Sequence, residues 1–371
     1  MELGETRTRR IDGTPGRAHT HPVPKARAAL FYGPGRPLEI RSLRIPDPGP
    51  GELVVRISSA TICGSDLHTV HGRRAERTPC VLGHEAVGRV EAAGRDRGSY
   101  WLGRRISWTL ADSCGRCAPC LRWDLPQKCE HLFKYGHAPL EDGSGLNGCY
   151  ASHVVLRPGT AVVSVPESLE DSVAAPANCA LATMVGATET LATPGDIAVI
   201  QGAGLLGIYG CALLRSYGWG RVLVVDRHPG RLQMVASFGG EAVAANAVDD
   251  LRAGSVDAVI EACGDPAVVP AGVRLLRPGG TYILAGMVHP ESRIDLTGEA
   301  IIRKCLTLRG QHNYAPRHLE AGIRFLERHA GTFPWHRLVS PPLGLDSLGE
   351  ALRIAESGEW ARVSIRPDAE K

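Results

Sequence analysis

The sequence predicts an α/β protein in which an irregular β domain carries a second domain built on a doubly wound parallel sheet. Two textures along the chain predict this class. Residues 26–165 consist of short β-type runs, such as ELVVRISS and ASHVVL, separated by turns rich in glycine and proline. Residues 171–310 alternate apolar strands with helical stretches, which is typical of a parallel sheet covered by helices. A chain of 371 residues has room for both domains.

We divide the chain into four segments on this basis. Residues 1–24 contain no apolar core and are expected to form a flexible arm, not a secretion signal. The irregular β domain spans residues 25–178, and the parallel-sheet domain spans residues 179–315. Residues 316–371 hold the helical pattern RHLEAGIRFLERH and the final strand RVSIRP, and we expect them to return and complete the first domain.

Composition excludes several classes of function. The net charge of +3 is small and evenly spread, which argues against a nucleic-acid partner. No apolar run approaches the roughly 18–20 residues that span a bilayer, so we expect a cytoplasmic protein without a membrane partner. The 11 cysteines are odd in number and tightly clustered, which favours metal binding over a framework of disulfides.

A glycine motif marks the start of the parallel-sheet domain. In DIAVIQGAGLLG, Gly202 makes the turn, Gly204 lets the backbone approach a pyrophosphate, and Gly207 lets the helix pack on the strand. The next strand, RVLVVD, ends in Asp226, which is placed to accept hydrogen bonds from the ribose hydroxyls and to repel a 2′-phosphate. We therefore expect NAD as the cofactor, although the following Arg227 could tolerate NADP. The alternative is a glycine turn in a purely structural α/β unit.

Two groups of metal-binding residue types stand in the first domain. The segment SCGRCAPCLRWDLPQKC holds four cysteines, which can surround one tetrahedral Zn²⁺ completely and so form a structural site. The other group is dispersed over ICGSDLH, VLGHEAVG and PANCALATM. One Cys, one His and a second Cys would leave the fourth zinc position open, as a catalytic zinc requires. Spacing alone does not select the second cysteine. The four clustered cysteines are Cys114, Cys117, Cys120 and Cys129.

Taken together, these motifs resemble the zinc-dependent medium-chain alcohol dehydrogenase family. GHEAVGRVEAAG is similar to the family's zinc signature, and ICGSDLH, the four-cysteine segment, the glycine motif and RVSIRP follow in the family's order. The resemblance covers about residues 26–367. It implies a GroES-like catalytic domain and a Rossmann domain, two zinc ions per chain, a homodimer or homotetramer, and reversible oxidation of a small-molecule alcohol to an aldehyde or ketone.

The resemblance also implies roles for single residues. Cys63, His84 and Cys179 would bind the catalytic zinc. Around it, Glu85 would assist ligand exchange and Asp66 would orient His84, while Ser65 would take the alcohol proton and pass it through the cofactor ribose towards His68. On the cofactor, Thr183 would pack on the nicotinamide, Arg231 would lie near the adenosine ribose, and Arg362 would lie near the pyrophosphate. The gap from Cys120 to Cys129 is one residue longer than the family's usual spacing.

Some segments, including LPQKCEHLFKYGH and RGQHNYAPRHLEAGIRFL, are most similar to a subgroup of dehydrogenases associated with phosphonate metabolism. We therefore expect an anionic substrate, such as 2-hydroxyethylphosphonate or phosphonoacetaldehyde, held by Lys134 and His137. The alternative for KYGH is a surface or subunit interface. Two other functions stay open: a threonine- or polyol-type dehydrogenase, and a zinc-stabilised nucleotide-binding scaffold without turnover.

Overall fold

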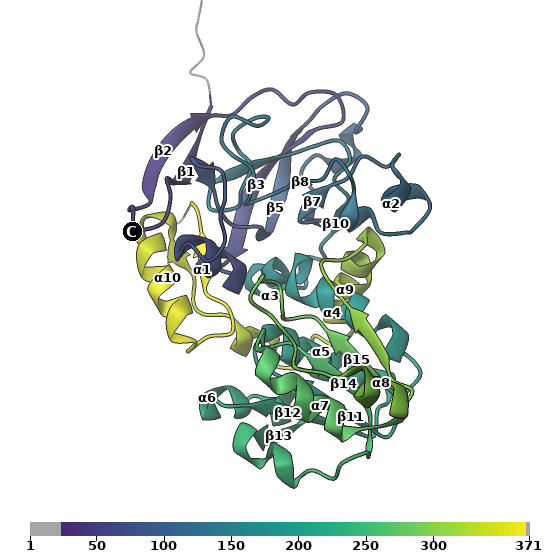
Figure 1. The fold of residues 1–371 in the computed structure, drawn as a ribbon. Coiled ribbons are helices and arrows are strands. Elements are labelled where there is room, and N and C mark those ends of the chain that lie inside the picture. The colour runs from purple at the N-terminus through teal and green to yellow at the C-terminus, as the bar shows by residue number, and fades with distance from the viewer. Residues whose placement is uncertain (1–23, 369–371) are drawn as a thin grey trace, which may run out of the picture.

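The computed structural model describes residues 24–368, so the expected N-terminal arm, apart from Pro24, lies outside the described residues. Figure 1 shows two halves, one above the other, with the parallel sheet in the lower half. Helices α3 (Asp171–Ala174), α4 (Ala180–Thr188) and α9 (Pro316–Arg328) lie between them, and α10 (Leu348–Ser357) lies beside the upper half. Within residues 24–368, none of the helices is long and apolar enough to cross a membrane.

The upper half is built from two sheets and a short ladder. The smaller sheet has the order β2–β1–β4, with strands at Lys25–Phe31 (β1), Glu39–Arg44 (β2) and Cys80–Val81 (β4). The larger has the order β10–β6–β5–β3–β18–β17, with β9 also paired to β3. Its strands are β3 (Leu53–Thr61), β5 (Glu85–Ala93), β6 (Arg105–Trp108), β9 (His153–Leu156), β10 (Val162–Ser164), β17 (Leu343–Gly344) and β18 (Ser364–Arg366). The ladder joins β7 (Ala111–Asp112) to β8 (Phe133–Lys134).

The end of the chain is part of the upper half. Strand β18 pairs antiparallel with β3 and sets Ile365 opposite Ala60, and both side chains are buried in the same apolar core. Helix α10 adds Leu348 and Leu352 to that core and contacts α1 (Gly64–Val70). The apolar face of α9 instead joins the core of the lower half.

The lower half is a six-stranded sheet in which every pair is parallel. Its order is β13–β12–β11–β14–β15–β16, so the chain order reverses on either side of β11. The strands are β11 (Ile197–Gln201), β12 (Arg221–Asp226), β13 (Glu241–Ala244), β14 (Val256–Glu261), β15 (Leu276–Leu284) and β16 (Thr307–Gly310), and the helices are α5 (Leu205–Tyr217), α6 (Pro229–Leu232), α7 (Val269–Leu275) and α8 (Gly298–Arg303). Ligands of such sheets bind at the carboxyl ends of the strands beside this reversal.

Both faces of β11 are covered, which explains why it reads as a continuous apolar run. Ala198 and Ile200 belong to one buried cluster and Val199 to another on the opposite face. Parallel strands covered by helices on both sides need apolar side chains at every position.

The three motif glycines have different surroundings. Gly202 has a φ of +114°, a left-handed conformation that favours glycine. A Cβ on Gly207 would lie 1.8 Å from the carbonyl oxygen of Gly202, whereas a Cβ on Gly204 would meet no atom within 4 Å. Gly207 is therefore required by the packing of α5 on β11, while Gly204 is not required by packing within the chain.

We expect Gly207→Ala to lower the free energy of unfolding by about 3 kcal/mol, because a methyl group there overlaps backbone. Gly204→Ala should leave the thermal unfolding temperature unchanged and weaken nucleotide binding, since its methyl group would project into open space at the start of α5. Calorimetry of unfolding and of nucleotide binding checks both variants. Equal stability losses in the two variants would contradict this account of the glycine motif.

Candidate functional site

Four metal-binding side chains meet where the two halves join. The ligand atoms of Cys63, His84, Glu85 and Cys179 all lie within 4.8 Å of one another. Cys63 precedes α1, His84 precedes β5, Glu85 is the first residue of β5, and Cys179 precedes α4. The structure thus brings together the residues that the sequence resemblance had grouped, from segments more than 100 residues apart.

Asn178 links the segment before α4 to the rest of this cluster. Its side-chain amide donates to the carbonyl oxygens of His84 and Trp108, at 3.0 Å each. Asn178 is fully buried, and its own carbonyl oxygen accepts a hydrogen bond from the hydroxyl of Tyr314. These bonds set the position of the adjacent Cys179 relative to His84.

The donor set of the cluster fits a zinc ion. Two thiols and an imidazole are ligands that zinc prefers, and because the Glu85 carboxylate pairs with Arg362, these three ligands leave one position for a substrate. The hydrogen bond from Cys179, together with nearby Arg362 and His84, holds the pKa of Cys63 well below its ordinary value despite burial. A thiolate is the form that binds metal.

Asp66 faces the Nδ1 atom of His84. Its Oδ1 lies 3.4 Å from Nδ1 of His84, and neither atom has a hydrogen-bond partner by strict geometry. A metal-bound imidazole commonly donates its second N–H to a carboxylate, which fixes the tautomer that leaves Nε2 for the metal. The two buried, unpartnered atoms are placed for that interaction.

Glu85 is held by two partners that sequence reasoning missed. Its carboxylate accepts a hydrogen bond from the Thr61 hydroxyl at 2.6 Å and pairs with the Arg362 guanidinium at 2.8 Å. Glu85 is fully buried, and burial raises its pKa while Arg362 lowers it. Arg362 also approaches the sulfur of Cys63 at 3.6 Å. The position of Arg362 near a pyrophosphate stays a prediction. The pairing of Arg362 with Glu85 joins residues 277 positions apart, so no local sequence pattern predicts it.

Ser65 and His68 lie on α1, three residues apart, and both are partly exposed. Among residues 24–368, the structure records no hydrogen bond between their side chains. Burial, Arg73 and His289 lower the pKa of His68, so its imidazole is a neutral group at neutral pH. His289 follows β15, and it therefore brings the lower half close to α1.

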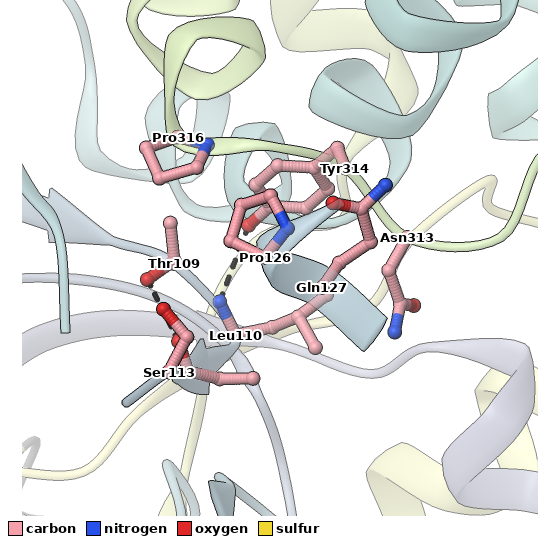
Figure 2. Close-up of a pocket in the computed structure, with 9 residues that line it drawn as sticks. Thr109, Leu110, Ser113, Pro126, Gln127, Asn313, Tyr314 and Pro316 are labelled. Carbon is pink, nitrogen blue, oxygen red and sulfur yellow. Dashed lines mark hydrogen bonds between the residues drawn. The ribbon is translucent and has the colours of Figure 1, made fainter. Parts of the chain in front are cut away.

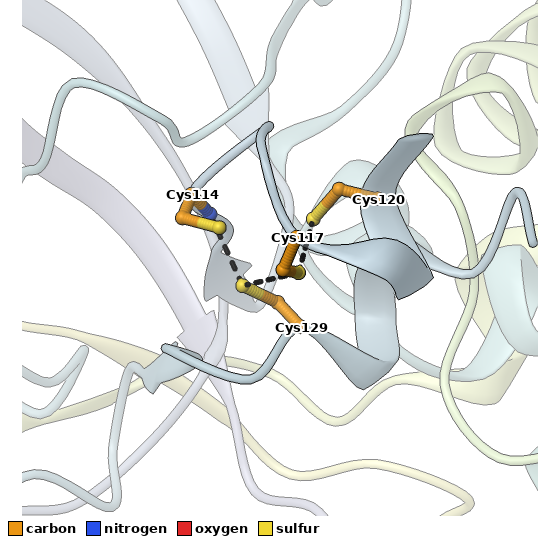
Figure 3. A group of neighbouring side chains, drawn as sticks. All are labelled: Cys114, Cys117, Cys120 and Cys129. Carbon is orange, nitrogen blue, oxygen red and sulfur yellow. Dashed lines mark hydrogen bonds between the residues drawn. The ribbon is translucent and has the colours of Figure 1, made fainter. Parts of the chain in front are cut away.

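The four-cysteine segment forms a second cluster, which Figure 3 shows. The Cys117 sulfur lies 3.4 Å from that of Cys120 and 3.8 Å from that of Cys129. Tetrahedral zinc with Zn–S bonds of about 2.3 Å requires sulfur atoms about 3.8 Å apart. Backbone N–H groups of Cys114 and His131 also donate to the Cys129 sulfur. The extra residue before Cys129 therefore does not prevent it from joining the cluster.

The cofactor candidates come from the carboxyl edge of the parallel sheet and from the helices α4 and α6. Asp226 is buried, and its two carboxylate oxygens accept hydrogen bonds from the backbone N–H groups of Ala203 and His228. Thr183 is buried on the first turn of α4. Arg231 reaches towards Gly358, at the end of α10. The structure leaves their contacts with a cofactor as predictions.

Lys134 and His137 lie close to the Cys63 cluster in different surroundings. Burial, with Arg74 nearby, lowers the pKa of Lys134 to about 8, and no carboxylate of the described residues lies within 4 Å of its amine. The His137 ring lies 5.4 Å from the His84 ring between centroids, tilted by 30°, and its Nδ1 forms a hydrogen bond of 2.8 Å with Glu76. Burial and Lys134 lower the pKa of His137 well below its ordinary value, so the ring is neutral.

A small cavity is lined in part by residues of the four-cysteine segment. Leu110, Gln127, Asn313 and Tyr314 are among its lining residues, and the Leu110 N–H donates to the Tyr314 hydroxyl (Figure 2). Its volume of about 20 Å³ suits a water molecule and not a substrate.

Comparison with known protein families gives two matches. Residues 49–167 match the alcohol dehydrogenase GroES-like domain, and residues 206–328 match the zinc-binding dehydrogenase family. Together with the observed sheets, these matches confirm the predicted combination of a GroES-like domain and a Rossmann domain.

Individual relatives agree with these matches. A probable zinc-binding alcohol dehydrogenase of Mycobacterium tuberculosis is 30% identical, over 92% of this chain and 89% of the relative. Sorbitol dehydrogenase of Bacillus subtilis is 26% identical over 94% and 99%. The crystal structure of an alcohol dehydrogenase from Thermotoga maritima superimposes with a TM-score of 0.85 at 30% identity, covering 93% of this chain and 100% of that one.

We expect the two clusters to hold one zinc each, with different consequences when they are lost. Cys117→Ala should lower the unfolding temperature strongly, because metal binding at a structural site contributes folding free energy. Cys63→Ala should remove one zinc and leave the unfolding temperature nearly unchanged. Mass spectrometry of bound metal and calorimetry measure both effects.

Cys305→Ala is the control for these variants, because Cys305 is exposed and outside both clusters. It should keep two zinc ions and the parent stability. A freshly purified parent chain with fewer than two zinc ions would contradict the assignment of the two clusters.

Proposed function

This chain belongs to the zinc-dependent medium-chain alcohol dehydrogenase family, and we propose that it reversibly oxidises an alcohol to an aldehyde or ketone with NAD as the hydride acceptor. The observation that carries the proposal is the cluster of Cys63, His84 and Cys179 at the junction of the two halves. Three such ligands leave a zinc position for the alcohol. A scaffold without turnover would have no need for that open position.

The residues of the chain bind, orient and exchange protons. When bound, zinc would lower the pKa of the substrate hydroxyl, and the nicotinamide would accept the hydride. The Ser65 hydroxyl would accept the alcohol proton as it gives up its own proton towards His68, which lies one turn further on the same partly exposed helix and is the exit towards solvent. Asp66 holds the tautomer of His84, and Thr183 supports the nicotinamide from α4. Arg362 pairs with the buried Glu85 carboxylate beside the metal position and opposes the rise in its pKa that burial causes.

The substrate that we propose carries an anionic group, with a phosphonate as the leading candidate. Lys134 supports this, because its partly buried ammonium lacks a carboxylate partner among the described residues and would be stabilised by an anion. The nearby Arg74 is already paired with Glu76 at 2.8 Å. Because His137 is neutral and already forms a hydrogen bond with Glu76, we propose that it contributes less than Lys134 to binding the anionic group of the substrate. The second candidate substrate is a polyol, as the name of the similar sorbitol dehydrogenase suggests, or threonine.

The test is the absorbance of reduced nicotinamide with a panel of neutral alcohols, polyols, threonine and hydroxyalkylphosphonates. The parent chain should oxidise members of this panel, and Cys63→Ala should oxidise none. Lys134→Ala should lower kcat/KM for phosphonates by about tenfold or more and change it little for neutral alcohols, because truncating one partner of a partly buried charge pair is costly.

Lys25→Ala is the matched control, since Lys25 is exposed at the start of β1. Equal losses on charged and neutral substrates, or inactivity on every phosphonate, would refute the anionic substrate and leave the dehydrogenase proposal intact. Failure of the zinc-loaded parent on the whole panel would refute the dehydrogenase proposal itself.

The cofactor that we propose is NAD, because the Asp226 carboxylate would be placed against a 2′-phosphate without a cation between them. Asp226→Asn keeps the shape and one acceptor oxygen, so it should narrow the ratio of kcat/KM between NAD and NADP by about tenfold, or about 1.4 kcal/mol. Arg227→Ala should act in the opposite direction by weakening NADP alone. A parent enzyme with the higher kcat/KM for NADP would contradict this assignment.

A further inference from the structure

We infer that Tyr150 is a positioning residue for the catalytic zinc, acting through Asp66 on His84. The inference rests on the proposed function only in assuming that Cys63, His84 and Cys179 bind zinc. Tyr150 is fully buried, and its hydroxyl donates a hydrogen bond of 2.8 Å to Oδ2 of Asp66. The sequence resemblance assigns a role to Asp66 and none to Tyr150.

Two buried hydrogen-bond donors hold the Asp66 carboxylate. It is fully buried, and among residues 24–368 no arginine or lysine approaches its carboxylate within 4 Å. An ionised carboxylate in such a place is stable only when donors satisfy its oxygens. Oδ2 has two donors, the Tyr150 hydroxyl and the Cys63 backbone N–H at 2.9 Å. Of these two donors, only the Tyr150 hydroxyl belongs to a side chain, so a substitution can remove it without changing a metal ligand.

The same two donors orient the carboxylate. Because both bind Oδ2, the other oxygen, Oδ1, is left to face Nδ1 of His84 at 3.4 Å. A carboxylate that loses one donor gains freedom to rotate away from the imidazole. Loss of a residue that hydrogen-bonds a metal ligand or its partner typically lowers metal affinity or activity by about 10- to 100-fold.

The backbone and ring of Tyr150 contact the segment between β4 and His84. The Tyr150 N–H donates to the Leu82 carbonyl oxygen at 2.9 Å, and its own carbonyl oxygen accepts from Ala29 in β1. Its ring covers Gly83, where a Cβ would lie 2.7 Å from two ring carbons and where φ is +87°. Tyr150 thereby sets the distance between the His84 segment and the Asp66 helix.

The variant that isolates the hydroxyl is Tyr150→Phe, with Tyr135→Phe as the matched control. Tyr135 is equally buried in the same core, and its hydroxyl bonds to Thr160 and to the Arg157 N–H, neither of which is a metal-binding residue. Both variants lose buried hydrogen bonds of one hydroxyl. A purely structural role for Tyr150 therefore predicts similar behaviour of the two.

The measurement is the rate at which zinc leaves the full-length, zinc-loaded chain for a chromogenic chelator. Two zinc sites should give two phases of zinc release, and the phase that Cys63→Ala lacks belongs to the catalytic zinc. We expect Tyr150→Phe to speed that phase about tenfold and to leave the four-cysteine phase unchanged. Tyr135→Phe should leave both phases unchanged. With Co²⁺ as the metal, Tyr150→Phe alone should shift the visible bands of the catalytic site.

A second arm tests the route through Asp66. In an Asp66→Asn background, Tyr150→Phe should change the rate of zinc release from the catalytic site by less than about twofold, because the effects of coupled residues are not additive. A full tenfold effect in that background would overturn the inference. Unchanged release from Tyr150→Phe, or the same acceleration in Tyr135→Phe, would overturn it while leaving the proposed function intact. A parent chain with no second release phase would refute the catalytic zinc and this inference together.

Discussion

The structure is organised around a group of buried ionisable side chains that need charged or hydrogen-bonding partners. Cys63, Asp66 and Glu85 lie together at the junction of the two halves, and burial in a medium of low polarity would neutralise each of them alone. Each has a dedicated partner. Arg362 reaches Glu85 and the Cys63 sulfur, while His84 and Tyr150 face Asp66. A divalent cation held by Cys63, His84 and Cys179 would complete this balance of charge.

The topology follows from the need to assemble these partners. Two of the metal-binding segments come from the antiparallel upper half, and the third comes from the start of α4. Arg362 arrives last, because β18 returns the chain to pair with β3 beside Thr61 and so directs the arginine to Glu85. The parallel sheet is thus inserted between parts of one site. Its reversal point at Gly202 then opens towards the same junction.

The sequence predicted the features that have local signals. The spacing of the glycine motif, in which close packing requires Gly207, and the spacing of the four clustered cysteines predicted both sites. The two patterns of strands and helices along the chain predicted both domain classes. Cys179 could be selected only through the family resemblance, because nothing in its spacing separates it from the other cysteines. The pairing of Glu85 with Arg362 and the bond from Tyr150 to Asp66 join residues 277 and 84 positions apart. Such contacts depend on strand order, which a single sequence does not specify.

The central claim is that Cys63, His84 and Cys179 form a zinc site distinct from the four-cysteine site. Zinc-edge X-ray absorption of the freshly purified chain tests it most directly, because the spectrum counts sulfur and lighter ligands. A site with four thiolates and a site with two thiolates, one imidazole and one oxygen ligand in the open position together predict about three sulfur neighbours per zinc, near 2.3 Å, and about one nitrogen or oxygen neighbour. The Cys63→Ala variant should move the average towards four sulfurs. A parent spectrum with four sulfurs per zinc, unchanged in that variant, would contradict the claim.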